Sequence, residues 1–264
     1  MYQRDFSFLD KNTPYELSVV LMADSFFYSL CDNQGVLCCH QSYTGLRFSE
    51  GMSDVISQFN YLDLTITKAR AVVFNHNSYL LPHRKDELAF QVPALEHKVN
   101  FVENVPGQNA VSYYGITEHQ ENALTSMYPN LSLAFRDLVS IFSTYYLNVL
   151  EQVFHLHIEE KCIYIYIQSQ GEMKFARSFD INGMHDVLYF VLAVCKSLDI
   201  NPSDLDLTLS GWIEVQSSMY NLLKSYIQNI KLAVNHPMRL HHESAEEQKP
   251  HYYFLHFALL SCAS

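Results

Sequence analysis

The chain is poor in basic residues and has few charges of either sign. Its 264 residues include 17 Lys and Arg against 28 Asp and Glu, a formal net charge of −11, and only 17% are charged. Binding to nucleic acid or to an anionic membrane surface relies on clustered Lys and Arg, so the composition argues against both. Disordered chains combine few apolar residues with many charges, whereas 48% of this chain is hydrophobic. We expect one large globular domain or two smaller ones, without a nucleic-acid partner.

Signals for a membrane span or for secretion are also lacking. The longest uninterrupted apolar run, residues 187–195, is far shorter than the ~20 residues that a spanning helix needs. The first residues contain no basic region followed by an apolar stretch. The six cysteines include no C-x-x-C pair, and most lie in apolar runs, where free cysteine packs as a small hydrophobic residue. These absences predict a cytoplasmic protein without a membrane span.

Motifs that dictate a reaction are missing as well. The sequence has no P-loop, nucleophile elbow, Rossmann glycine fingerprint or H-E-x-x-H pair. His155 and His157 are two residues apart, so they would share one face of a strand and could chelate a metal. No matching Cys, Asp or His partner is evident. The favoured interpretation is therefore an outward-facing pair on a strand, with no metal.

What the sequence does contain is an internal repeat. Each copy runs strand, strand, turn, strand and helix, and the turn glycine is Gly35 in the first copy and Gly171, 136 residues further on, in the second. Apolar and β-branched runs predict the strands of the two copies over 17–23, 25–31 and 36–43, and over 153–158, 161–167 and 173–179. Further short strands are expected over 70–74 and 205–209. Two related α/β halves follow from this repetition.

Helical spacing of apolar residues predicts the helices. One helix starts near Met52 in the first copy, and its counterpart, N-capped by Asn182, starts near Gly183 with a stripe of apolar residues. We expect this second helix to be among the most buried in the protein. A capping box predicts a helix from Thr117, and further helices are expected over 137–150, around 219–227 and over 252–262, the last after a polar loop.

The strand–strand–strand–helix–strand–helix order, given twice, resembles the duplicated ribonuclease-H-like fold of the actin-like ATPase superfamily. That superfamily includes actin, the Hsp70 chaperones, sugar kinases and the pilus-assembly platform proteins. The whole chain is also similar to an uncharacterised family from Bacteroides-type bacteria that is assigned this fold. The resemblance implies an α/β protein with two ribonuclease-H-like halves, residues 1–150 and 151–264, each a mixed sheet with helices on its faces. The second half would include the C-terminal helix.

The resemblance also implies where phosphate would bind. The first phosphate loop of the superfamily has an acidic residue and a glycine two positions on, which lets backbone amides close on phosphate oxygens. Here Asp24 and Ser25 stand at the junction, but Phe26 occupies the glycine position. The second loop offers Glu159 and Glu160 and no glycine, and both acids would repel a polyphosphate. The phosphate loops therefore match the superfamily poorly.

A third motif, a glycine pair next to the adenosine, corresponds to Gly211 followed by the bulky Trp212. The candidate cleft residues are thus Asp24, Ser25, Gly211 and Trp212. With these departures we expect no cofactor and a non-catalytic binding or scaffolding role, with another protein as the partner. The alternative is an active ATPase or small-molecule kinase with atypical phosphate loops that uses ATP and Mg²⁺.

Overall fold

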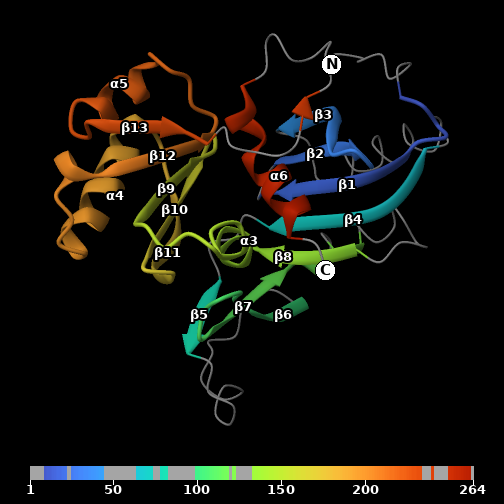
Figure 1. The fold of residues 1–264 in the computed structure, drawn as a ribbon, viewed down its shortest axis with the longest axis horizontal. Coiled ribbons are helices and arrows are strands. Elements are labelled where there is room, and N and C mark those ends of the chain that lie inside the picture. Colours follow the sequence, from blue (N-terminus) through green and yellow to red (C-terminus); the bar gives the residue numbers. More distant parts are fainter. Residues whose placement is uncertain are drawn as a thin grey trace.

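A computed structural model gives the three-dimensional structure of the chain. It describes residues 9–22, 25–44, 64–73, 78–82, 99–118, 121–122, 133–233, 239–240 and 249–262. Two mixed sheets lie on either side of two helices, and a small third sheet lies next to one of these helices (Figure 1). The helices expected near Met52 and after Thr117 fall largely outside the described residues.

The first sheet has the order β14-β3-β2-β1-β4-β8. Strand β1 pairs antiparallel with β2 and parallel with β4, while β2–β3 is antiparallel and β4–β8 is parallel. Its strands are β1 (Pro14–Leu21), β2 (Ser25–Asp32), β3 (Val36–Thr44), β4 (Thr65–Val73), β8 (Leu133–Asp137) and β14 (Arg239–Leu240).

The second sheet repeats this plan in the order β11-β10-β9-β12-β13, with two antiparallel and two parallel pairings in the same sequence. Its strands are β9 (Val153–Ile158), β10 (Cys162–Ser169), β11 (Glu172–Asp180), β12 (Asp206–Gly211) and β13 (Asn229–Leu232). The matched turn glycines, Gly35 and Gly171, both have a φ of +75°, a conformation that residues with a Cβ rarely adopt. The predicted α/β fold of two mixed sheets is confirmed, and an origin by duplication stays a prediction.

The third sheet was not predicted. Its order is β5-β7-β6, all antiparallel, with β5 (Tyr79–Pro82), β6 (Val99–Asn104) and β7 (Ala110–Ile116) lying between β4 and β8 in the sequence. The Gln108 side chain in the β6–β7 turn donates to the Gly171 carbonyl at 3.0 Å and accepts from the Met173 amide at 2.8 Å. The third sheet is thereby fixed to the β10–β11 turn of the second sheet.

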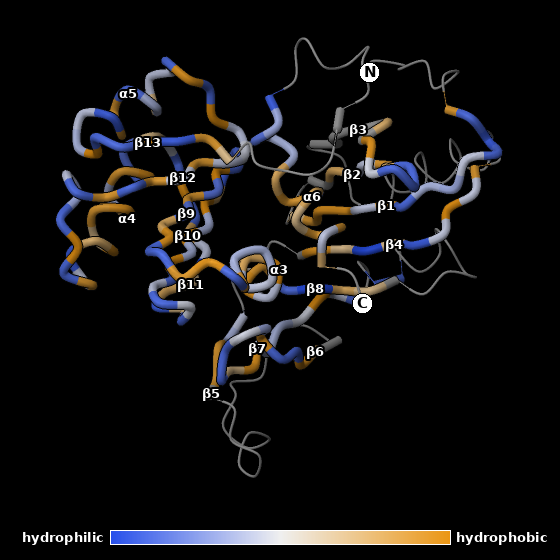
Figure 2. The backbone as a smooth tube through the Cα atoms, in the orientation of Figure 1, coloured by the Kyte–Doolittle hydropathy of each residue, from blue (hydrophilic) through white to orange (hydrophobic). Residues whose placement is uncertain are grey.

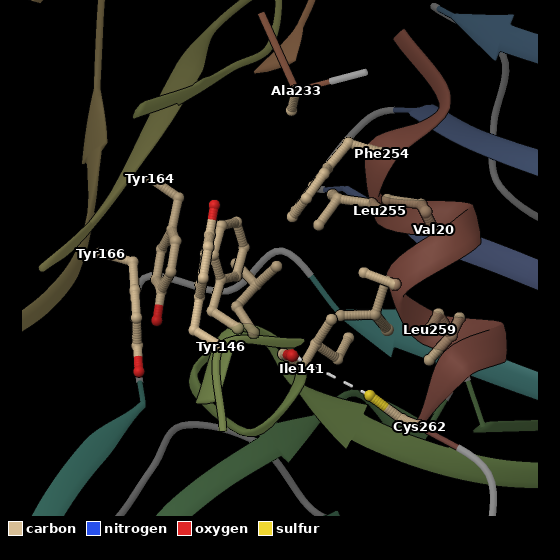
Figure 3. Packing of buried hydrophobic residues seen from close by; sticks show 14 of the residues in the cluster. Val20, Ile141, Tyr146, Tyr164, Tyr166, Ala233, Phe254, Leu255, Leu259 and Cys262 are labelled. Atoms are coloured by element: carbon tan, nitrogen blue, oxygen red, sulfur yellow. Dashed lines mark hydrogen bonds between the residues drawn. The ribbon is translucent and has the colours of Figure 1, made fainter. Parts of the chain in front are cut away.

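Helices α3 (Leu138–Tyr145) and α6 (Phe254–Ser261) fill the space between the two large sheets. Helix α6 is coloured apolar along much of its length in Figure 2, and every residue from Phe254 to Leu260 is buried. Figure 3 shows α6 side chains such as Phe254 and Leu259 facing the same core as Tyr146 and the β10 tyrosines Tyr164 and Tyr166. This core joins side chains from both sheets, so the two halves share one hydrophobic interior.

Helices α4 (Met184–Ser197) and α5 (Ser218–Lys224) pack against a separate core of the second sheet. Short 3-10 turns, η2 (Pro202–Asp204) and η3 (Pro250–Tyr253), precede β12 and α6. Helix α4 begins one residue later than expected, after Gly183, and the Asp186 carboxylate accepts from the Asn182 amide in place of an Asn182 cap. Its residue Leu188 is buried, but α3 and α6 are buried more completely because they lie between two sheets.

The C-terminal segment contacts the first sheet as well as the second, and the assignment of its helix to the second half stays a prediction. Strand β14 pairs parallel with β3, and α6 contacts β1, β4 and α3 more than it contacts β12. Because every residue from Phe254 to Leu260 is buried, α6 needs cover on every side, and α3 together with both sheets provides it. The boundary at residue 150 itself stays a prediction. In the described residues no helix combines the length and apolar composition that crossing a membrane requires.

Candidate functional site

The carboxyl ends of β9 and β12 bring several candidate residues together. These strands are parallel neighbours, and their last residues, Ile158 and Gly211, form a register pair. The next residues along the two strands are therefore Glu159 and Trp212. The Trp212 amide donates to the Ile158 carbonyl at 2.7 Å, which holds the two chain ends close together.

Gly211 is required by this close approach. Its φ is +83°, and a Cβ at this position would stand 2.0 Å from the Ile158 carbonyl oxygen. No side chain can be accommodated there without moving one strand. The need for glycine at the motif position is explained by strand packing alone, with or without a nucleotide.

The Trp212 indole lies between parts of the chain that are far apart in sequence. Its ring centroid is 6.2 Å from that of Phe27 in β2 and 5.9 Å from that of Tyr252 in η3, the latter at an interplanar angle of 19°. Trp212 is still 51% exposed. Ser25 is the first residue of β2, two residues before Phe27, and Asp24 lies outside the described residues. The structure thus brings Trp212 to the strand that begins at Ser25.

The segment after Trp212 anchors the chain that leads into α6. The Glu214 carboxylate pairs with Lys249 at 2.9 Å and accepts from the Tyr252 hydroxyl at 3.1 Å. A ring nitrogen of His251 lies 2.7 Å from the Ile213 carbonyl oxygen and donates to it. Burial lowers the pKa of His251, so its neutral form is favoured. These contacts fix the Tyr252 ring against Trp212.

A buried chain of hydrogen bonds leads to the same site and was not predicted. The Tyr146 hydroxyl lies 2.6 Å from Nδ1 of His155, and Nε2 of His155 lies 2.7 Å from the Ser210 hydroxyl. The same hydroxyl is 2.7 Å from Nδ1 of His157, whose Nε2 is 2.9 Å from Oε1 of Glu159. Both histidines are completely buried, and Glu159 is 5% exposed.

One assignment of protons satisfies every link of this chain. A carboxylate only accepts, so His157 donates from Nε2 and accepts at Nδ1 from the Ser210 hydroxyl. Ser210 then accepts from Nε2 of His155, whose Nδ1 accepts from Tyr146. Burial raises the pKa of Tyr146 above its ordinary value, so its hydroxyl keeps its proton and can donate. In this series of hydrogen bonds every donor therefore lies on the Tyr146 side of its bond, and Glu159 is the final acceptor.

The second carboxylate oxygen of Glu159 is different. Oε2 is buried and has no hydrogen-bond partner among the described residues.

The expectation of an outward-facing histidine pair, His155 and His157, is corrected, because α3 and α6 cover this face of β9. No cluster of three or more His, Cys, Asp or Glu side chains suited to a metal ion occurs in the described part of the chain.

A second buried carboxyl group, Asp137, lies at the junction of β8 and α3. The Ser112 hydroxyl donates to Oδ2 of Asp137, and the Asp137 amide donates to Glu103 at 3.2 Å. Burial raises the pKa of Asp137 to about 6. The sequence signal was an acidic residue directly between an apolar strand and an apolar helix, which was interpreted only as a helix start.

The fold is shared with several solved structures. A protein of Bacteroides thetaiotaomicron VPI-5482 with an actin-like ATPase fold and unknown function is 20% identical, with a TM-score of 0.69 over 99% of this chain and 100% of that one. A PilM–PilN type IV pilus biogenesis complex matches at 10% identity and a TM-score of 0.60, over 94% and 99%. The cytoplasmic domain of EpsL, an inner-membrane component of the type II secretion system of Vibrio cholerae, is 9% identical in sequence. Its TM-score is 0.52, over 95% of this chain and 96% of that one. The chain therefore has the actin-like ATPase fold.

No curated protein matches the chain. A family described as protein of unknown function (DUF3822) matches residues 5–230, and the chain belongs to this family.

Proposed function

We propose that the chain is a non-catalytic binding or scaffolding protein, in which side chains occupy the place where an actin-like ATPase would hold a nucleotide. The contact of Trp212 with Phe27 carries this proposal. It joins the carboxyl end of β12, where the resemblance places adenosine, to β2, which follows the first phosphate loop. A nucleotide in that position would have to displace an indole that is also stacked on Tyr252.

The charge at the second phosphate loop supports the same proposal. The loop closes with a hydrogen bond from the Glu159 amide to the Cys162 carbonyl at 2.8 Å, so that amide does not face a ligand. Phosphate cradles need free backbone amides and glycine. Two acidic side chains, Glu159 and Glu160, stand there instead. A polyphosphate would meet negative charge where the superfamily offers donors.

A protein partner fits the settings in which this fold occurs. Two of the similar structures are named for assemblies: the PilM–PilN complex and a component of the type II secretion system. By analogy we propose that this chain also acts by binding another protein, in the cytoplasm and without nucleic acid. The free, mostly buried cysteines of the described residues, such as Cys31 and Cys195, suit a reducing compartment.

Thermal and chemical unfolding with and without Mg-ATP tests the proposal. A ligand present at a hundred times its dissociation constant stabilises a protein by about 2.7 kcal/mol. We expect no stabilisation at millimolar Mg-ATP and no hydrolysis above background. Saturable stabilisation, together with hydrolysis that Asp24→Ala abolishes, would instead favour the alternative, an ATPase or small-molecule kinase with atypical loops.

A further inference from the structure

We propose that Glu159 and Trp212 together form a receptor for a cationic side chain, a guanidinium or ammonium group, presented by the protein partner. This inference rests on the proposed binding function and specifies what the partner contributes. It starts from the pairing of Gly211 with Ile158, which makes Glu159 and Trp212 the next residues on adjacent strands.

One oxygen of the Glu159 carboxylate is buried and unpaired within the described residues. Glu159 Oε1 accepts from His157, while Oε2 has no partner in the described part of the chain although the residue is only 5% exposed. A buried charged oxygen without a donor is costly, since it has lost water and gained nothing in return. A donor that arrives with a positive charge would repair this deficit.

The hydrogen bonds through His157 and Ser210 hold the Glu159 carboxylate in a preorganised position. His157 is completely buried and donates to Oε1, and its own position is held by the Ser210 hydroxyl. The carboxylate is therefore oriented before any ligand arrives, which reduces the ordering cost of binding. His157 and Ser210 are positioning residues, because they act only through Glu159.

The Trp212 indole offers a ring face to a cation. Tryptophan is the side chain that attracts cations most strongly through its ring face. Trp212 is 51% exposed, while Tyr252 and Phe27 support it and limit its rotation. A planar guanidinium can stack on an indole and at the same time donate to a carboxylate, so arginine suits this pair of residues best.

The sign of the charge disfavours an anionic ligand, and the small number of ligating atoms disfavours a metal ion. Glu160 adds a second acidic side chain to the loop, and the whole chain carries a net charge of −11, so the surrounding field attracts cations. A metal ion would need several oxygen or nitrogen ligands. Only one oxygen of the Glu159 carboxylate lacks a hydrogen-bond partner here, and the described residues contain no cluster that could complete such a site.

The experiment uses the fact that Trp212 is the only tryptophan of the chain. Its fluorescence, excited selectively over tyrosine, reports on the surroundings of the Trp212 indole. The probe is a short capped peptide, Gly-Ser-Arg-Ser-Gly, titrated into the full-length protein, and the matched control peptide carries citrulline, the neutral isostere, in place of arginine. We expect a saturable change of Trp212 fluorescence with the arginine peptide and a response at least about tenfold weaker with citrulline.

Two variants locate the binding. Glu159→Gln keeps the size and one acceptor but removes the charge, and should weaken binding of the arginine peptide by about tenfold or more. Glu172→Gln, an exposed glutamate paired with Lys174, is the control and should leave binding unchanged. Should Glu159→Gln fail to fold, the comparison of arginine with citrulline on the unaltered protein still decides.

Several outcomes would overturn the proposal. These are the absence of saturable binding, equal binding of the citrulline peptide, or unchanged binding by folded Glu159→Gln. A saturable response to MgCl₂ or CaCl₂ alone, at constant ionic strength and abolished by Glu159→Gln, would replace the organic cation with a metal ion. Binding and hydrolysis of Mg-ATP would contradict the proposed non-catalytic function instead, so the two failures can be told apart.

Discussion

A Cβ atom on Gly211 would stand 2.0 Å from the carbonyl oxygen of Ile158. The two strands therefore approach at a distance that only glycine allows, and the same oxygen accepts from the Trp212 amide. This close approach explains why Glu159 and Trp212, the residues that follow the pair, are neighbours at the carboxyl ends of β9 and β12. It also accounts for the glycine of the adenosine motif without any ligand.

Gly211→Ala should destabilise the protein by at least about 3 kcal/mol. The positive φ alone costs an L-residue roughly 1–2 kcal/mol, and the clash with the Ile158 backbone adds to it. Chemical denaturation measures the loss. The control is Gly183→Ala, because a Cβ on Gly183 meets nothing within 4 Å and its φ of 177° is ordinary extended backbone. A Gly211→Ala protein as stable as this control would show that the strands separate freely.

Most strands of the two large sheets were predictable because they have local signals. Apolar runs mark these strands, and Gly35 and Gly171 mark turns whose positive φ needs glycine. The short strands β13 and β14 were not predicted, and β14 lies in the segment that was expected to be a polar loop.

Two strands of the third sheet have weak signals: β5 has only four residues and ends in Pro82, and β6 mixes apolar residues with Asn and Glu. Short strands with polar faces depend on pairing partners that the sequence does not identify. Strand β7, with its apolar and aromatic residues, and the turn glycine Gly107, whose φ is +72°, did carry a local signal, and this strand was missed.

The candidate site was predictable only in part, for a similar reason. The motif positions Gly211 and Trp212, and the acidic Glu159, can be read from the sequence. The approach of Phe27 to Trp212 cannot, because it depends on how the two halves pack. His155 was interpreted as outward-facing because strand alternation does not reveal that helices cover both faces of β9.

Ser210→Ala should cost about 2–4 kcal/mol of unfolding free energy. The hydroxyl lies within hydrogen-bond distance of both His155 and His157, and its loss removes one partner from a buried ring nitrogen of each. Ser197→Ala is the matched control, since the Ser197 hydroxyl bonds only within its own helix at the partly exposed end of α4. Equal stability of the two variants would mean that the histidine rings find other partners.

Asp137 should make stability depend on pH in an unusual direction. Burial raises its pKa to about 6 from the ordinary 3.8, so the folded state holds its proton more tightly than the unfolded state does. Its contribution to stability is present below about pH 4 and is lost as pH rises through about 6, by about 3 kcal/mol in total.

Asp137→Asn removes this dependence while an amide oxygen can still accept from Ser112. Relative to the unaltered protein, the variant should gain stability steadily between about pH 4 and pH 7. Unfolding free energies measured across that range provide the test, and the difference between the proteins cancels the contributions of exposed carboxylates. A difference that stays constant with pH would show that Asp137 titrates normally.

Gln108 fastens the third sheet to the second. Its amide donates to the Gly171 carbonyl and accepts from the Met173 amide, so it occupies the edge of β11 as a neighbouring strand would. Gln108→Ala should lower the unfolding free energy by about 1–2 kcal/mol and speed hydrogen exchange of the Met173 amide. The neighbouring exposed Asn109, changed to Ala, should do neither. Unaltered exchange at Met173 in Gln108→Ala would mean that packing around the turn, and not the Gln108 amide, holds the third sheet in place.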